Sequence, residues 1–195
     1  MDAEAARIFA AVLAAGDASR FGSTKQLVEL HGVPLVRRAT DMAARVCGDR
    51  VVTVLGHDWP NVLAALGSAA GFLVLNENYR EGMGTSIAAA ARACTSLADA
   101  LIVVLADQPL VSAEHLQALV NRWSGASDEV VASSYAGTMG PPVLFASDAF
   151  ATLGSLRGDA GARAVLSDSR FRLSSVPFEP ASVDIDTTAD LAALT

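Results

Sequence analysis

The sequence alternates short apolar runs with amphipathic stretches, and this alternation limits the possible folds more than any other feature. Apolar runs such as those at 8–13 and 101–106 are followed by turns and then by segments of helical periodicity. Strands that are apolar throughout, rather than at every second residue, are typical of a parallel sheet buried on both faces. The pattern therefore predicts an α/β fold of three layers, with a mostly parallel sheet between two layers of helices.

The expected elements follow one another along the whole chain. Strands are expected at 8–13, 51–55, 72–75, 101–106, 130–134, 142–145 and 172–176. Helices are expected at 34–46, 58–66, 85–94, 112–123, 147–153, 160–167 and 187–194. No repeat, linker or low-complexity segment interrupts this order, so residues 1–195 are expected to form a single domain.

Composition and charge exclude several classes of protein. The chain is 52% hydrophobic and 18% charged, with a mean hydropathy of +0.38, which is too apolar for a disordered chain. The net charge of -7 argues against nucleic acid as a partner. Cys47 and Cys94 stand alone, and the three histidines lack metal-ligand spacing, which argues against a disulfide scaffold or a zinc hydrolase.

The sequence also predicts where the protein is located. No apolar run reaches the roughly 18 residues that cross a bilayer, so no membrane association is expected. The start of the chain is acidic and lacks the basic region of a signal peptide. A cytoplasmic protein is therefore expected.

The loops that follow the expected strands are the candidate binding segments. In open sheets of this type, ligands bind at the carboxyl ends of the strands. The loops to consider are 14–25, 76–84, 106–110, 136–142 and 184–186.

The first of these loops has the composition of a phosphate-binding turn. It follows a strand and contains Gly16 and Gly22, so that backbone N–H groups can hold a phosphate. Arg20 and Lys25 add two cations, and Lys25 is the only lysine among 14 basic residues. The glycine spacing matches neither a P-loop nor a dinucleotide-binding motif, which leaves a nicotinamide-dependent oxidoreductase little support. The alternative is a plain surface turn.

Carboxylates follow two of the expected strands. Asp107 comes directly after the most apolar strand, where it would face the ligand crevice, and Mg²⁺ prefers such ligands. Its alternative role is to cap the next helix, although Ser112 is better placed for that. In extended geometry Asp184 and Asp186 point the same way, and either could complete a metal site with Asp107. Capping of the last helix by Asp186 or Thr187 is the competing interpretation.

Two glycine-containing loops open helices. The segment 76–86 ends a strand and begins a helix, which is typical of a binding loop and also of plain helix capping. The segment 158–163 places Arg163 in the first turn of a helix, where a cation opposes the helix dipole. Arg163 is therefore expected to have a negative partner, either a substrate phosphate or Asp159.

These segments together resemble a known family. The motifs are LAAG with Arg20, Gly22 and Lys25 after it, GHD at 56–58, GMGTSI at 82–87, ADQP at 106–109, GPPVLF at 140–145, GDAGAR at 158–163 and DIDT at 184–187. The chain resembles the molybdenum cofactor nucleotidyltransferases over residues 8–194, and it is most similar to their cytidylyltransferase branch (MocA-like, among the MobA-like NTP transferases). The first motif is shared with many sugar-nucleotide pyrophosphorylases, whereas the later set is much narrower.

The resemblance implies a fold and a reaction. The fold is the Rossmann-like one of nucleotide-diphospho-sugar transferases. In the reaction the terminal phosphate of molybdopterin attacks the α-phosphate of CTP and pyrophosphate leaves, with Mg²⁺ as the cofactor. A molybdenum hydroxylase that receives the product is the implied protein partner. The branch follows from Ala15 in LAAG, where the guanylyl branch typically has glycine, and from ADQP.

The resemblance also implies roles for individual residues. The residues that would face the base are Leu13, Ala14, Ala15 and Gly16. Those that would contact the triphosphate are Arg20 and Lys25, while Asn76 and Ser86 would contact the nucleoside. Asp107 would hold Mg²⁺, with Asp186 as the second ligand, and Lys25, Arg20 and Asp107 form the catalytic set. The pterin side would be lined by Gly140 and by the loop with Gly158 and Arg163.

Three other functions remain open at this point. Within the enzymes, they are guanylyl transfer to molybdopterin and nucleotidyl transfer to a sugar phosphate. From a different class, the chain could be a non-catalytic carrier or insertion partner for the molybdenum cofactor. The presence of both Lys25 and Asp107 favours catalysis, because a carrier needs neither.

Overall fold

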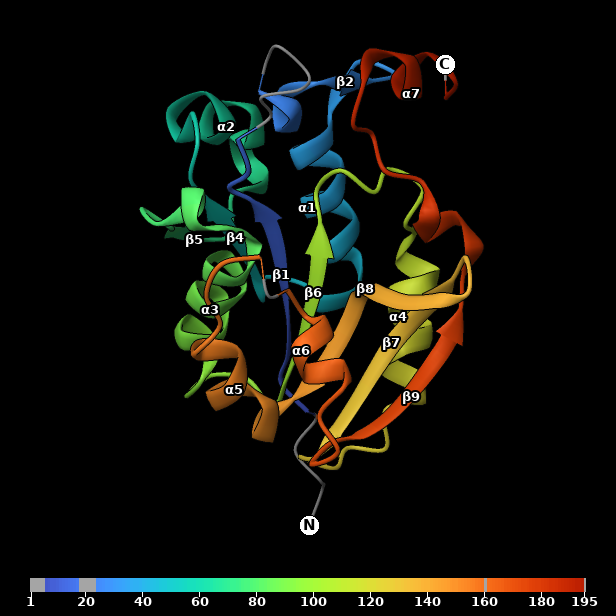
Figure 1. The fold of residues 1–195 in the computed structure, drawn as a ribbon. Helices are drawn as coiled ribbons and strands as arrows, with labels where there is room; N and C mark the ends of the chain where they lie inside the picture. Colours follow the sequence, from blue (N-terminus) through green and yellow to red (C-terminus); the bar gives the residue numbers. More distant parts are fainter. Residues whose placement is uncertain (1–5, 18–23, 160, 195) are drawn as a thin grey trace.

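The computed structural model describes residues 6–17, 24–159 and 161–194 (Figure 1). Its centre is a seven-stranded sheet, which contains all seven strands expected from the apolar pattern. In spatial order these are β5 (Phe72–Leu75), β4 (Val51–Leu55), β1 (Ile8–Ala14), β6 (Ala100–Leu105), β8 (Thr138–Ala146), β7 (Glu129–Tyr135) and β9 (Arg172–Pro177).

The sheet is mostly parallel, as expected, and β8 is the exception. The pairs β4–β5, β1–β4, β1–β6 and β7–β9 are parallel, whereas β8 runs antiparallel to both β6 and β7. β8 reverses direction because it follows β7 through a tight turn at Ala136 and Gly137, which both have positive φ. Part of the segment 136–142, expected to be a loop, is therefore the start of a strand.

Helices cover both faces of the sheet, which confirms the three-layer α/β/α architecture. Side chains from α1 (Leu35–Cys47), α2 (Trp59–Leu66) and α4 (Ala113–Arg122) share one apolar core. Those from α3 (Met83–Cys94), α5 (Phe150–Gly154) and α6 (Arg163–Leu166) share the other. Figure 1 shows α3, α5 and α6 in front of the sheet, with α1 and α4 behind it.

The central strands supply both cores by simple alternation. In β1, Phe9, Ala11 and Leu13 face the α3 side, whereas Ala10 and Val12 face the α1 side. Because β1 and β6 are covered on both faces, almost every residue in them is apolar and buried.

A small third core lies at the carboxyl edge of the sheet. It joins the hairpin β2–β3 (Glu29–Leu30 and Val33–Pro34) to the C-terminal segment that ends in α7 (Thr188–Ala192). The strand pattern did not predict this hairpin, because two-residue strands are too short to show a periodicity. Its turn at His31 and Gly32 has positive φ at both residues.

Helix lengths differ from the expectations mainly near the C-terminus. The helix expected at 160–167 is the short α6, and the one expected at 187–194 is α7. The segment expected as a helix at 147–153 begins as a 3₁₀ turn, Ser147–Ala149, before α5. No helix in the described part of the chain is long and apolar enough to span a membrane.

Candidate active site

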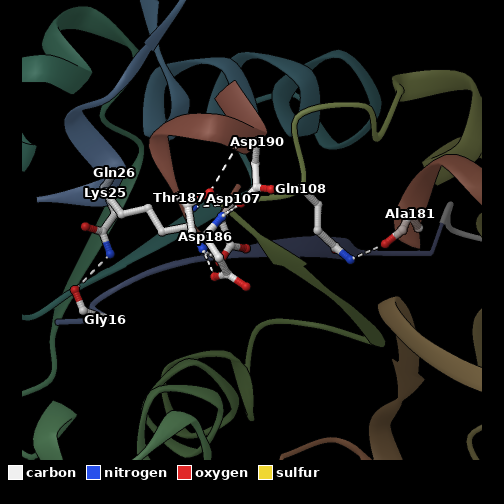
Figure 2. Close-up of polar contacts among 9 residues, drawn as sticks. All are labelled: Gly16, Lys25, Gln26, Asp107, Gln108, Ala181, Asp186, Thr187 and Asp190. Carbon is white, nitrogen blue, oxygen red and sulfur yellow. Dashed lines mark hydrogen bonds and ion pairs between the residues drawn. The ribbon is translucent and has the colours of Figure 1, made fainter. Parts of the chain in front are cut away.

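Lys25 lies between two carboxylates at the carboxyl edge of the sheet. Its Nζ donates to Oδ2 of Asp107 at 2.7 Å and to Oδ1 of Asp186 at 2.7 Å (Figure 2). The Lys25 side chain is only 13% exposed, whereas that of Asp186 is 62% exposed. Three residues from distant parts of the sequence thus form one charged cluster that borders solvent.

The local structure explains how the three residues meet. Asp107 is the second residue after β6. Lys25 is the first residue of a short 3₁₀ helix, Lys25–Leu27, which follows the first loop. The backbone N–H of Ile185 donates to the carbonyl oxygen of Asp107 at 3.0 Å. The Ile185 side chain is fully buried with Leu30 and Leu35, which holds the neighbouring Asp186 beside Asp107.

Helix capping is performed by residues other than Asp107 and Asp186. The last helix is capped by Thr187, whose hydroxyl accepts from the backbone N–H of Asp190, and the Asp190 carboxylate accepts from Thr187 in return. The Asp186 side chain therefore points to Lys25 instead of capping the helix. Likewise, Ser112 caps α4 by accepting from the backbone N–H of His115, which leaves Asp107 free of that role.

The cluster controls the charge of its own members. Burial lowers the pKa of Lys25, but the charges and hydrogen bonds of Asp107 and Asp186 outweigh it, so this pKa lies above its ordinary value. Lys25 is therefore a cation at physiological pH. The loss of water around Asp184 and the negative charge of Asp107 raise the pKa of Asp184 to about 6.

The cluster lies at one end of a cavity of about 430 Å³. The cavity extends from Lys25 and Asp107 to the first turn of α3, and its wall includes both apolar and charged residues. The predicted site residues that line it are Leu13, Ala15, Gly16, Lys25, Ser86 and Asp107. Residues that the sequence analysis did not assign also line it, namely Asp17, Gln26, Leu35, Tyr79, Arg80, Gly82, Met83, Leu105, Ala106 and Asp159.

Two predicted nucleotide-binding residues lie behind the cavity wall, and a third lies outside the described residues. The Ala14 side chain is fully buried in the core on the α1 side. The Asn76 amide donates to the hydroxyls of Thr85 and Ser86, at 2.8 and 2.9 Å, and so ties β5 to the first turn of α3. Asn76 thus positions Ser86, which itself lines the cavity. Arg20 falls in the segment 18–23, outside the described residues.

Gly140, predicted on the pterin side, is buried against Tyr135. A Cβ at position 140 would lie 2.5 Å from the Tyr135 hydroxyl oxygen, so a larger residue there would require the Tyr135 ring to shift. Burial raises the pKa of Tyr135, and the charge of Asp184 adds to the shift. Gly140, which has no side chain, thus leaves space for the Tyr135 ring.

The loop around Gly158 packs against the start of α3. Its carbonyl oxygen accepts from the backbone N–H of Gly84 at 2.9 Å. A Cβ on Gly82, which has a φ of +117°, would lie 2.4 Å from the Gly158 carbonyl carbon. Arg163 is exposed, and within the described residues it forms no ion pair with Asp159. The ion-pair alternative for Arg163 is therefore wrong in this structure.

Two residues missed by the sequence analysis have clear structural roles. Arg80 lines the cavity and adds a second described cation to its wall. Its guanidinium carbon lies 5.4 Å from the centre of the Tyr79 ring. Gln108 is buried, and its Nε2 donates to the carbonyl oxygen of Ala181 at 2.7 Å (Figure 2). This bond connects the segment after β6 to the chain that leads to Asp186. Arg80 could have been found as a cation in the 76–86 loop.

The residues present fit a Mg²⁺ ion that binds together with a triphosphate. Oδ1 of Asp107 is buried and has no hydrogen-bond partner in the described part of the molecule, and a cation would supply the partner that this oxygen lacks. The described residues contain no group of three or more His, Cys, Asp or Glu that could hold a metal alone. Mg²⁺ commonly binds through one or two carboxylates and completes its shell with phosphates and water. Asp107 and Asp186 would supply those carboxylates.

Known proteins are similar to this chain over most of its length. Purine catabolism protein PucB from Bacillus subtilis (strain 168) is 31% identical over 172 residues, which cover 84% of this chain and 82% of PucB. Rv0371c from Mycobacterium tuberculosis H37Rv, solved in complex with manganese, is 25% identical with a TM-score of 0.79, covering 96% of this chain and 97% of that one.

A second solved structure, molybdopterin-guanine dinucleotide biosynthesis protein A from Archaeoglobus fulgidus, is 21% identical with a TM-score of 0.67, and the match covers 95% of both chains. This last similarity shows the fold alone. The family model of the MobA-like NTP transferase domain matches residues 10–175, which is most of the sequence. The match includes Lys25 and Asp107 and ends before Asp186. The chain therefore belongs to the MobA-like NTP transferase family.

Proposed function

We propose that this chain transfers CMP from CTP to the terminal phosphate of molybdopterin and releases pyrophosphate. The observation that carries the proposal is the position of Lys25 between Asp107 and Asp186, beside a cavity that reaches the N-terminus of α3. A helix N-terminus and a buried ammonium both favour anionic oxygens. The described wall carries Lys25 and Arg80 against Asp17, Asp107 and Asp159, and the whole chain has a net charge of -7, so a bound Mg²⁺ would supply the positive charge that an anionic substrate requires.

The proposed reaction does not require the protein to transfer a proton. A phosphate oxygen of molybdopterin is ionised at neutral pH and forms a bond to the α-phosphorus of CTP. The bond between this phosphorus and the oxygen that bridges to the β-phosphate breaks, and its electron pair leaves with pyrophosphate. No general base is needed, which agrees with a cavity whose described lining contains no histidine.

The protein's contribution is therefore to position the substrates and to compensate charge. Lys25 and Arg80 are the described cations of the cavity wall. Mg²⁺, held by Asp107 and Asp186, would neutralise charge that develops on the phosphates. Ser86 and the backbone of Leu13, Ala15 and Gly16 would contact the nucleoside, since they line the other part of the cavity.

The choice of CTP is supported by the sequence motifs, because LAAG and ADQP are typical of the cytidylyl branch. Membership of the MobA-like NTP transferase family supports nucleotidyl transfer. The pterin side would lie near Tyr135, Gly158 and Arg163. The manganese complex of a relative supports a divalent metal at this kind of site.

A panel of nucleotides and acceptors tests the proposal directly. CTP, GTP, ATP and UTP are each combined with molybdopterin or with a sugar 1-phosphate, and pyrophosphate release is measured with Mg²⁺. We expect molybdopterin with CTP to be at least about tenfold better in kcat/KM than with GTP, within the range that small contacts in a pocket provide. A preference for GTP would place the chain in the guanylyl branch. Release only with the sugar phosphate, or tight molybdopterin binding without release, would overturn the proposal.

A further inference from the structure

The turn between β4 and α2 contacts both ends of the first loop. The backbone N–H of His57 donates to the carbonyl oxygen of Ala15 at 3.1 Å, where the loop begins. The Thr24 hydroxyl donates to Oδ2 of Asp58 at 2.7 Å, where the loop ends. Thr24 immediately precedes Lys25. One turn, Gly56–Asp58, therefore holds the chain at both ends of the loop that precedes Lys25.

Asp58 adopts an unusual conformation to make this contact. It is the N-cap residue of α2, and its φ of 50° and ψ of 32° lie in the left-handed region, which is uncommon for a residue other than glycine. An aspartate at an N-cap usually accepts from a backbone N–H of the first helical turn, but this carboxylate makes no such bond. It accepts from Thr24 and from the Asn61 side-chain amide instead. The Asp58 carboxylate is therefore bound to the Thr24 and Asn61 side chains and not to the backbone of α2.

The turn is also pressed closely against the first loop. A Cβ at Gly56 would lie 2.7 Å from the carbonyl oxygen of Ala15 and 2.9 Å from the Cβ of Tyr79, so no side chain fits there. This close approach brings Asp58 within reach of Thr24. The hydrogen bond from His57 to Ala15 holds the turn against the start of the loop.

Lys25 is held from both sides along the chain. Thr24 is held by Asp58, and the Gln26 amide donates to the carbonyl oxygen of Gly16 at 3.0 Å (Figure 2). The position of the Lys25 backbone sets which points the ammonium can reach at the end of its four-carbon side chain. The Thr24–Asp58 bond fixes the start of the short helix Lys25–Leu27.

We propose that Asp58 is a positioning residue for Lys25 and acts through the Thr24 hydroxyl. Asp58 does not line the described cavity, and its effect on the reaction passes through the placement of the ammonium between Asp107 and Asp186. The effect on catalysis rests on the proposed function, whereas the effect on Lys25 itself does not.

Lys25 gives a direct readout, because it is the only lysine in the chain. Isotope-labelled lysine therefore gives a single set of side-chain NMR signals, whose position and relaxation report the placement and mobility of this ammonium. Thr24→Val removes the donor and keeps the shape, and Thr24→Ser keeps the hydroxyl. Thr95→Val is the control, because it makes the same change at an exposed threonine whose hydroxyl donates to the carbonyl oxygen of Ala91 at the far end of α3.

We expect Thr24→Val to shift the Lys25 signals and increase their mobility, while Thr24→Ser and Thr95→Val leave them as in the wild type. Asp58→Ala should give the same change as Thr24→Val, and the double variant no more than either alone. Should Asp58→Ala fail to fold, the two Thr24 variants still decide. Unchanged Lys25 signals in Thr24→Val would overturn the proposal.

Kinetics separates positioning from a merely structural role. Thr24→Val should lower kcat for pyrophosphate release about tenfold and change KM by less than about twofold, since small misplacements of catalytic groups are costly. The same substitution in the Lys25→Ala background should cause no further loss. A Thr24→Val variant with wild-type kcat and only a lower Tm would refute the positioning role. If wild type releases no pyrophosphate with any substrate while the NMR changes appear, the proposed function fails and the placement of Lys25 by Asp58 stands.

Discussion

The backbone N–H of Ile185 donates a hydrogen bond to the carbonyl oxygen of Asp107, and this bond joins the C-terminal segment to the end of the central strand β6. The side chain of Ile185 is fully buried beside Leu30 and Leu35. Asp186, the next residue, reaches Lys25 from this anchored position. The second carboxylate of the site therefore depends on a hydrophobic contact as well as on its own charge.

Truncating this anchor should affect both stability and the site. Ile185→Ala should lower the free energy of unfolding by about 2–5 kcal/mol, and Ile185→Val by only about 0.5–1.5 kcal/mol. Turnover of Ile185→Ala should also fall, because Asp186 loses its support. Leu153→Ala, in the opposite core, is the control: it should lose similar stability and keep its kcat when assayed well below its Tm. Equal kcat in both variants would contradict the anchoring role.

Removing the ammonium should damage catalysis far more than folding. Lys25→Ala should lower kcat about 10²–10³-fold, the range seen when a preorganised charge-stabilising group is removed. Lys25→Arg should not restore activity, because a planar guanidinium cannot replace a compact ammonium between Asp107 and Asp186. Pyrophosphate release and thermal unfolding measure the two effects. Wild-type turnover in Lys25→Ala would show that this residue has no part in the reaction.

Single substitutions to asparagine should impair metal-dependent activity more at Asp107 and Asp186, the proposed metal ligands, than at Asp184. Asp107→Asn should abolish metal-dependent activity, and Asp186→Asn should raise the Mg²⁺ concentration needed for half-maximal activity. Asp184→Asn should have the smaller effect, because Asp184 is not paired with Lys25 in the structure. Titration with Mn²⁺, followed by its electron paramagnetic resonance signal, measures metal binding without turnover. Equal loss for Asp184 and Asp186 would mean that both aspartates serve the metal.

A buried histidine should make stability depend on pH. Burial lowers the pKa of His115 from 6.5 to about 4, and its Nε2 lies 2.7 Å from the Ser133 hydroxyl, which donates to the Pro142 carbonyl oxygen. Below pH 6.5 this histidine binds a proton in the unfolded chain but stays neutral in the folded chain. Its contribution to the free energy of unfolding is therefore complete above pH 6.5 and is lost as the pH falls toward 4.

For this histidine the loss should reach about 2 kcal/mol by pH 5. Urea unfolding at pH 7 and pH 5 measures it, and His115→Gln should show a smaller pH dependence than the wild type. His31→Gln, which changes an exposed histidine, is the control and should keep the wild-type slope. A His115→Gln variant with the full wild-type slope would assign the pH dependence to other groups.

Local patterns in the sequence were sufficient for the layers of the fold and for part of the site. Continuous apolar runs predicted the central strands β1 and β6, because burial on both faces leaves no polar alternation. Asp107 was predicted at the carboxyl edge because it follows the most apolar strand, and Ser112 was predicted as the cap of the next helix; both lie where expected. These features depend on residues close together in the chain, so a local pattern is enough to predict them.

The arrangement between distant segments was decided only by the tertiary structure. The run FLVL of β5 is as apolar as VVTVL of β4, yet Phe72, Leu73 and Leu75 are exposed because β5 is an edge strand. The sequence suggested a phosphate partner for Lys25, whereas the folded chain places its ammonium between Asp107 and Asp186. Periodicity records which face of an element is buried, but not which segment covers it. Pairing between remote segments follows from packing of the whole chain, as at Ile185, where one buried side chain brings the last acidic residue of the site into place.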